Sequence, residues 1–311
     1  MAVPFAPELS IRPLSPEQHL DAAGALVNRM LQRAPYSAPM PQVLLRQQLF
    51  EQQPRTLYPV RWQTRQLLGA WRAGELIGIA DAGVSFEVDD EVEGHSVGRL
   101  RFLALPERVE LVAETAHMLL AAVEHFWQAN RVGEAHAFSS AGGYPTLQGG
   151  AGMLPGDWSD QVQVLTANGY HFEERYYCLA RTAGVLLEEI APQTGLALAL
   201  RGDDTDRGYQ VFFRRTELIA EARLVRAEVA ANGASRTVGY LAAWHVDARW
   251  RNQKVGRWLL RRMINDATQR GLAEVFLHVQ LQQAAALNLL GQHGFEELNY
   301  RGYTFTKALA A

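Results

Sequence analysis

The sequence contains very little cysteine and lysine and has no long hydrophobic run. Its one cysteine, Cys178, excludes an intramolecular disulfide framework and a thiolate metal cluster, which is typical of a reducing compartment. A membrane-spanning helix needs about eighteen consecutive apolar residues, and no segment of this sequence comes near that length. The N-terminus "MAVPFAPELSIRP" lacks the basic and apolar regions of a secretory signal. We therefore expect a soluble, cytoplasmic protein with no membrane partner and no metal site.

The net charge is also small. It is −3 over 311 residues, so no overall field favours nucleic acid as a partner. Apolar residues make up 48% of the chain, which is enough to bury one large core or two medium ones.

Basic residues concentrate in one stretch, residues 249–262, which holds six of them and no acidic residue. Lysine occurs only at Lys254 and Lys307 in the whole chain, so Lys254 is an unusual choice in this stretch. Two interpretations are open at this point. The stretch is either a solvated basic turn, as such runs usually are, or a site for an anion.

Two parts of the sequence repeat each other. "WRAGELIGIA" (71–80) parallels "FRRTELIAEA" (213–222), and each has the alternating pattern of a hairpin. "SVGRLRFLALP" (96–106) parallels "TVGYLAAWHVDA" (237–248) at nearly the same offset. This spacing predicts two copies of one α/β unit, 1–183 and 184–311.

Each copy is predicted to run hairpin, strand, loop, helix, strand, helix, strand. In the second copy a helix follows the basic loop and ends at Gly271, a strand spans 274–279 and a helix spans 283–294. The first copy begins with a strand in "LSIRPLS" and two helices, whereas residues 184–208 are too few to repeat them.

The loop that joins strand to helix in the second copy suits an anion. Residues 251–256 would leave backbone amides unpaired at the helix N-terminus, where the dipole favours negative charge. Gly256 lets a phosphate approach the backbone, and the neighbouring arginines supply bidentate donors. The first copy has "PERVELVAE" here, with three glutamates and no glycine. These features predict a pyrophosphate site in the second copy only.

"VDARWRNQKVG" (246–256) resembles the pyrophosphate loop of GNAT superfamily N-acetyltransferases, roughly V-x-P-x-[YF]-[RQ]-x-x-G-x-[GA]. Ala248 replaces the proline and Lys254 replaces the first glycine. "LHV" (277–279) and "GF" (294–295) fall where the family has its fifth strand and the end of its fourth helix. The order of these motifs extends over most of the chain, in a tandem layout similar to that of mycothiol synthase-like acetyltransferases.

The resemblance implies two tandem units of α/β (α+β) class. Each would have a mixed, mostly antiparallel twisted sheet flanked by helices, with splayed central strands in the second unit. The first unit would be degenerate, and the second would bind acetyl-CoA or another acyl-CoA. The residues implied in binding are Val246, Ala248, Arg251, Asn252, Gln253, Lys254, Val255, Gly256, Arg257 and Gln283. The extra residue between the Val-Gly pair and this loop, compared with the first copy, predicts a β-bulge there.

Catalytic residues are harder to identify. The family's usual tyrosine acid falls at Leu290, and its base position falls near Tyr240. His245 is a further candidate, although strict alternation turns it to the face opposite Val246. Tyr303, on the terminal strand, is a candidate replacement for the acid. A thiol with a reference pKa of about 8.5 can also leave as the anion without an acid.

We therefore expect an acyl-CoA dependent N-acyltransferase that acts on a small-molecule amine or a peptide, as a monomer or a homodimer. The alternatives are a non-catalytic acyl-CoA-binding or sensing protein and an interaction scaffold made of two degenerate units. The glycine-rich segment 139–156 has no basic residue and follows the wrong strand for a phosphate loop, so we interpret it as a surface or lid loop.

Overall fold

The computed structural model of the protein describes residues 8–89, 92–231 and 234–309. The chain forms two compact units, Met1–Arg175 with Gly302–Ala311, and Tyr176–Arg301. The sequence repeat placed a single boundary at 183. The difference arises because the last strand of each repeat supplies residues to the other unit.

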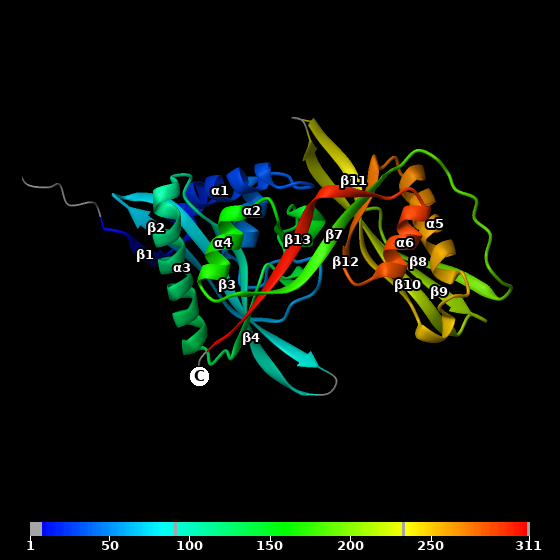
Figure 1. Cartoon of the computed structure of the whole chain (residues 1–311), viewed down its shortest axis with the longest axis horizontal. Coiled ribbons are helices and arrows are strands. Elements are labelled where there is room, and N and C mark those ends of the chain that lie inside the picture. Colours follow the sequence, from blue (N-terminus) through cyan, green and yellow to red (C-terminus); the bar gives the residue numbers. More distant parts are fainter. Residues whose placement is uncertain (1–7, 90–91, 232–233, 310–311) are drawn as a thin grey trace, which may run out of the picture. The chain divides into compact units, whose positions relative to one another are not determined.

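The first unit has the strand-and-helix order expected for the first repeat (Figure 1). Its elements are β1 (Ser10–Pro13), α1 (Pro16–Arg33), α2 (Gln42–Phe50), β2 (Trp62–Arg72), β3 (Glu75–Asp89), β4 (Val92–Ala104), α3 (Val109–Ala129), β5 (Glu134–Ala137), the 3-10 turns η1 (Ser140–Gly142) and η2 (Gln148–Gly150), β6 (Leu154–Pro155) and α4 (Ser159–Ala167). The strand order in its sheet is β1-β2-β3-β4-β5-β13, and β6 also pairs with β13.

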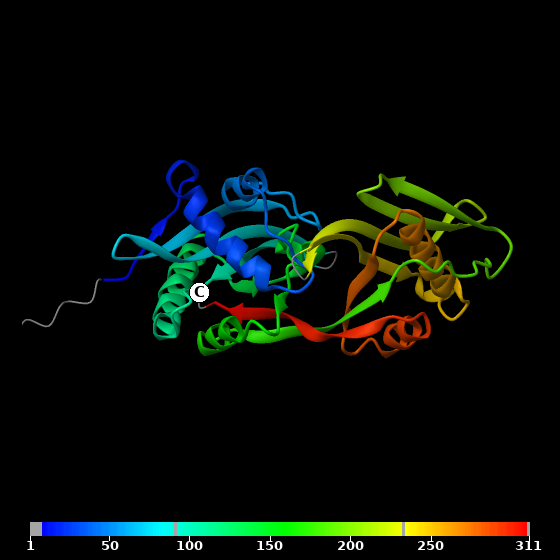
Figure 2. The same cartoon turned by 90° about the horizontal axis from the view of Figure 1, so that it is seen from above.

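The second unit repeats this plan without the two N-terminal helices, as the shortness of 184–208 predicted. Its elements are β8 (Leu196–Gly202), β9 (Asp206–Phe213), β10 (Glu217–Ala231), β11 (Ala234–Val246), the 3-10 turn η3 (Ala248–Trp250), α5 (Val255–Gln269), β12 (Glu274–Gln280) and α6 (Ala284–Gln292). The strand order is β8-β9-β10-β11-β12-β7. Figure 2 shows the long β10–β11 hairpin in yellow and the two helices in orange.

Two strands serve both units. β7 (His171–Thr182) pairs through its residues 176–182 with β12 of the second unit. β13 (Glu296–Ala308) pairs through residues 305–308 with β5 of the first unit, where it is drawn in red in Figure 1. Phe305 is fully buried in the first core, and Lys307 Nζ lies 2.6 Å from Glu124 Oε1. The first unit is therefore completed by residues that follow the second in sequence.

The local signals in the sequence account for the turns and for α5. Ala73 and Gly74, both at positive φ, form the two-residue turn between β2 and β3. Arg214 and Arg215, also at positive φ, belong to the three-residue turn between β9 and β10. On α5 the apolar residues at four-residue steps (Val255, Leu259, Met263 and Ala267) are all buried, and Gly271 follows the helix at φ 69°. The same core contains Tyr209 of β9 and Leu290 of α6.

Both units contain a bulge in their fourth strand. In β11 the register skips Ala242, and in β4 it skips Arg101, three residues after the Val-Gly pair in each case. The sequence comparison had attributed the predicted bulge to the extra residue of the second repeat. Because both repeats have the bulge, the extra residue is not its cause. It lies between the bulge and the loop instead.

No helix among the described residues is long and apolar enough to cross a membrane. Nor do three or more His, Cys, Asp or Glu side chains gather there in a way that could hold a metal ion.

Candidate active site

The central strands of the second unit separate after a short paired stretch. β11 and β12 run parallel and pair only at Gly239–Val275 and Tyr240–Phe276. Beyond these pairs β11 continues to Val246 and β12 to Gln280 with no further pairing between them among the described residues. Because the strands are parallel, their C-terminal ends lie at the same edge of the sheet. The result is a fork whose open backbone edges can accept an extended ligand.

The loop that follows β11 is held in place by side chains of β9 and β10. Asp247 accepts a hydrogen bond from the Arg249 amide at 2.9 Å, which starts the turn η3. The Trp250 indole donates to Glu217 at 3.2 Å and its ring lies 4.8 Å from that of Phe213. These contacts determine where the chain leaves the strand and enters α5.

The turn into α5 keeps the backbone shape of a glycine-bearing loop. Asn252 and Lys254 both adopt the left-handed conformation, with φ 63° and 66°. Lys254 therefore occupies, with a side chain, a conformation that normally favours glycine. A Cβ on Gly256 would lie 3.3 Å from Cγ2 of Val246, so the helix begins close against the end of β11.

The first turn of α5 presents amides that have no acceptor within the helix, those of Val255, Gly256 and Arg257. The side chains of residues 251–254 are all exposed. Arg251 Nε donates to the carbonyl of Val246 at 3.2 Å, and Gln253 donates to the carbonyl of Arg249 at 2.9 Å. The loop thus combines free helix-end amides with positive charge, an arrangement that binds anions.

The remaining predicted binding residues lie at the same end of the unit. Val246 ends β11 and Ala248 begins η3. Gln283 is the N-cap residue of α6, which follows β12, and its side chain donates to Gln280 at 3.0 Å. The parallel strands thus bring the loop and Gln283 to one edge of the sheet.

A tyrosine and a histidine meet at the last paired position of the fork. Tyr240 Oη lies 3.2 Å from Nδ1 of His278, and the ring of Tyr240 lies 4.9 Å from that of Phe276. Nε2 of His278 is buried without a hydrogen-bond partner among the described residues. Burial lowers the pKa of His278 to about 3, so this histidine is neutral near pH 7.

The sequence had indicated Tyr240 but not His278. His278 lies in "LHV", and the pattern of this segment is that of an ordinary buried strand. The signal that could have found it is the parallel register, which places residue 278 two positions beyond the partner of Tyr240.

The bulge changes the faces of β11. Val225 pairs with Tyr240, whereas Arg223 pairs with Ala243 and Glu221 with His245. Tyr240 and His245 therefore lie on the same face, which strict alternation would not give. His245 is exposed near the end of the strand.

Two other residues of interest belong to the apolar cores. Leu290 is fully buried in the core of the second unit. Tyr303 belongs to the first unit, where its ring lies 5.2 Å from that of Phe172 and packs against that unit's core.

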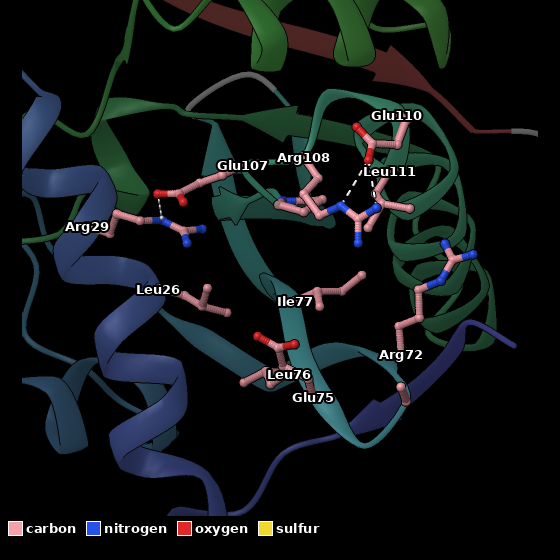
Figure 3. A pocket seen from close by; sticks show the side chains of 12 residues that line it. Leu26, Arg29, Arg72, Glu75, Leu76, Ile77, Glu107, Arg108, Glu110 and Leu111 are labelled. Atoms are coloured by element: carbon pink, nitrogen blue, oxygen red, sulfur yellow. Dashed lines mark hydrogen bonds and ion pairs between the residues drawn. The ribbon is translucent and has the colours of Figure 1, made fainter. Parts of the chain in front are cut away.

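The equivalent end of the first unit has a pocket of about 640 Å³ of different character (Figure 3). Arg29 and Arg72 lie on opposite sides of it, and each has a carboxylate partner, Glu107 at 3.5 Å and Glu114 at 3.1 Å. Arg108 likewise pairs with Glu110 at 2.8 Å. The sequence had suggested an acidic loop because of its three glutamates, and the structure pairs each of them with an arginine. No glycine and no left-handed residue occurs between Leu105 and Arg108, so this loop does not form a pyrophosphate cradle.

The first unit has a buried charged cluster at the bulge of its fourth strand. Arg101, at the bulge of β4, lies 3.0 Å from Asp81, and Tyr144 donates to the same carboxylate at 2.6 Å. All three are essentially inaccessible, and burial is the main cause that raises the pKa of Tyr144. Tyr144 belongs to segment 139–156, which is largely buried. Our interpretation of that segment as a surface or lid loop is therefore wrong.

Comparisons with known proteins support the fold. A tandem GNAT protein from the clavulanic acid biosynthesis pathway is 12% identical, with a TM-score of 0.64 over 98% of this chain and 99% of that one. A GCN5-related N-acetyltransferase from Sphaerobacter thermophilus is 13% identical, with a TM-score of 0.59 over 97% and 96%. A glucosamine N-acetyltransferase region in a fungal multi-domain β-N-acetylglucosaminidase is 12% identical, with a TM-score of 0.67 over 96% of this chain and 38% of that one. No curated protein matches the sequence.

The fold over nearly the whole chain is thus that of a tandem GNAT protein. Residues 173–295 match the acetyltransferase (GNAT) family model. The matched segment coincides closely with the second unit.

Proposed function

We propose that the second unit binds acyl-CoA and transfers its acyl group to a primary amine. The observation that carries this proposal is the combination of the β11–β12 fork with the loop at its open edge. The loop keeps left-handed turns at Asn252 and Lys254 although neither is glycine. The family match to residues 173–295 supports the same unit.

The residues present suit the ligand. The amides of Val255, Gly256 and Arg257 would hold the pyrophosphate, with Lys254 and Arg251 adding positive charge. The open edge of β11 up to Val246 and Ala248 would pair with the pantetheine arm as an added strand. In this arrangement the thioester end reaches the bottom of the fork, beside Tyr240.

Transfer requires that the amine nitrogen bond to the thioester carbonyl carbon, that the carbon–sulfur bond break and that the ammonium proton pass to water. Leu290 cannot supply a proton to the departing sulfur. Tyr240 can donate a hydrogen bond to it, and His278, neutral and 3.2 Å away, would orient that hydroxyl. We assign Tyr240 the catalytic role and His278 the positioning role.

The test of activity is release of free thiol from acetyl-CoA in the presence of polyamines, aminoglycosides, amino acids and peptides, with acetyl-CoA affinity measured by calorimetry. The double substitution Lys254→Glu with Arg251→Glu should weaken binding at least tenfold through charge reversal at the anion site. Unchanged affinity in this variant would contradict the assignment of the loop.

The two residues at the fork are tested separately. Tyr240→Phe should lower kcat by about 100-fold, as for loss of one positioned donor, with little change in the KM for acetyl-CoA. His278→Gln should lower kcat less and shift its pH profile, because the tyrosine hydroxyl is left unoriented. His245→Gln is the matched control on the same strand face and should change kcat by less than about threefold. A larger loss in His245→Gln than in Tyr240→Phe would reverse the assignment.

A non-catalytic acyl-CoA-binding protein is the second candidate function. The burial of Leu290 at the position of the family's acid favours it. Such a protein would bind acetyl-CoA in the calorimeter yet release no thiol with any amine.

A further inference from the structure

Three arginines of the second unit converge on two neighbouring residues at the end of α6. Arg257 Nη2 lies 3.0 Å from Oε1 of Gln292, and Arg261 Nε lies 3.2 Å from Nε2 of His293. Arg181, on β7, donates to the carbonyl of His293. We call these three side chains the arginine cluster.

The arginine cluster has no counter-charge. None of its members has a carboxylate within 4 Å among the residues that the structure describes, whereas Arg262 on the same helix lies 3.6 Å from Glu189 and Arg270 lies 3.1 Å from Asp266. The positive charges of all three arginines act on His293, so they favour an anion at this place.

His293 responds to this local field. Burial lowers its pKa first, and the charges of Arg261, Arg257 and Arg181 lower it further, against a hydrogen bond to the carbonyl of Leu289 that raises it. Its Nδ1 lies 2.8 Å from that carbonyl, so Nδ1 is the donor and Nε2 accepts from Arg261. The histidine is therefore neutral near pH 7 and helps to place the guanidinium of Arg261.

The arginine cluster continues directly from the loop. Arg257 is the third residue of α5, and its amide is the last of the unpaired amides at the N-terminus of the helix. Arg261 lies one turn later on the same side of the helix. A ligand with one anionic group at the helix N-terminus and a second a short distance along α5 would meet both. Acyl-CoA has this form, because a single ribose joins its pyrophosphate to a phosphate monoester at the 3′ position.

We propose that the arginine cluster binds the 3′-phosphate of acyl-CoA. This inference rests on the proposed function of the second unit. A phosphate monoester suits the cluster because it carries up to two charges near pH 7 and three acceptor oxygens, which guanidinium forks pair bidentately. The cluster makes the protein selective for CoA over the otherwise identical dephospho-CoA, which lacks only this group.

The test compares the Kd values of CoA and dephospho-CoA by calorimetry, in the full-length wild-type protein and in Arg261→Gln. The wild type should bind CoA at least tenfold more tightly than dephospho-CoA. Arg261→Gln should reduce that ratio to about threefold or less by weakening CoA alone. Arg257→Gln should weaken both ligands, since this residue also belongs to the loop, and still reduce the ratio.

Arg262→Gln is the matched control, because Arg262 adjoins Arg261 in sequence but pairs with Glu189, and its ratio should equal that of the wild type. Thermal melting establishes that each variant is folded. Equal binding of CoA and dephospho-CoA by the wild type, or an unchanged ratio in Arg261→Gln, would overturn this inference and leave the proposed function intact. Failure of both ligands to bind the wild type would overturn the two together.

Discussion

Lys254 adopts a left-handed backbone conformation that is not expected from the sequence. The family-like loop normally places glycine there, and a lysine could have meant that the turn was lost. Instead the backbone keeps φ 66°, and the side chain remains exposed at the N-terminus of α5. The loop has thus accepted local strain while adding a positive charge where an anion would bind.

Substitutions at Lys254 can separate these two effects. Lys254→Gly should raise the free energy of unfolding by about 1 kcal/mol, because glycine adopts the left-handed region without a Cβ clash. Lys254→Ala removes the charge but keeps the Cβ, so it should leave stability nearly unchanged. Both should bind acetyl-CoA several-fold more weakly, since both lose the ammonium group. Urea denaturation and calorimetry measure the two quantities, and equal stability of the glycine and alanine variants would refute the strain.

At the scale of elements, periodicity and turn residues predicted most of the fold. The hairpins, α5 with its stop at Gly271, and the strand of residues 274–279 follow from local patterns and are observed as predicted. Two features are set by strands that are distant in sequence. A bulge between the Val-Gly pair and the loop was predicted, but its position at Ala242 depends on the pairing of β11 with β10. The placement of His278 beside Tyr240 depends on the register between parallel strands.

The anchoring of α5 to β9 shows a further contact of this kind. Asp266 lies 2.7 Å from Arg207 and 3.1 Å from Arg270, and it accepts a hydrogen bond from Tyr209 at 2.5 Å. Burial alone would raise its pKa, but the hydrogen bonds from Tyr209 and Arg270 and the charges of both arginines lower it overall. The helix that carries the anion loop is therefore held by one buried carboxylate.

Because the pKa of Asp266 is lower in the folded protein, its stabilising contribution is present above the unfolded value of about 3.9 and is lost as the pH falls through the lower folded value. Asp266→Asn should lower the free energy of unfolding by about 3 kcal/mol at pH 7, because the half-buried Arg207 and Arg270 lose their buried partner. The variant should also lose less stability than the wild type as the pH falls from about 4 to about 2, the range just below the reference pKa of aspartate. Urea curves at several pH values test this, with Asp204→Asn, an exposed partner of Arg207, as the control. A parallel acid dependence in wild type and variant would contradict it.

At the scale of the whole molecule, the two units have diverged within one plan. The second has an open fork and a cationic loop, while the first has the buried cluster of Arg101, Asp81 and Tyr144 and pairs the charges of its pocket. The repeat was legible in the sequence, because its hairpins share local patterns. The exchange of terminal strands was not, because β7 and β13 have the same alternation whichever sheet they join.

Removal of residues 302–311 tests this exchange. The shortened chain should lose amide-exchange protection in β5 and α3 of the first unit, since the strand that pairs with β5 and the buried Phe305 are gone. Protection in β11 and α5 should be retained. The milder variant Phe305→Ala should destabilise the first unit by about 3–5 kcal/mol. A chain that ends at Leu309 is the control, and loss of protection confined to the second unit would contradict the pairing.

The strand exchange also has a consequence during synthesis. The residues that complete the first sheet, 302–308, are translated only after the entire second unit. At about 5–20 residues per second, the ribosome exposes an unpaired edge of β5 for on the order of ten seconds before its partner arrives. The first unit to be made is thus the last to be finished, and an open strand edge of this kind is where a nascent chain is most exposed to wrong pairing or to capture by chaperones.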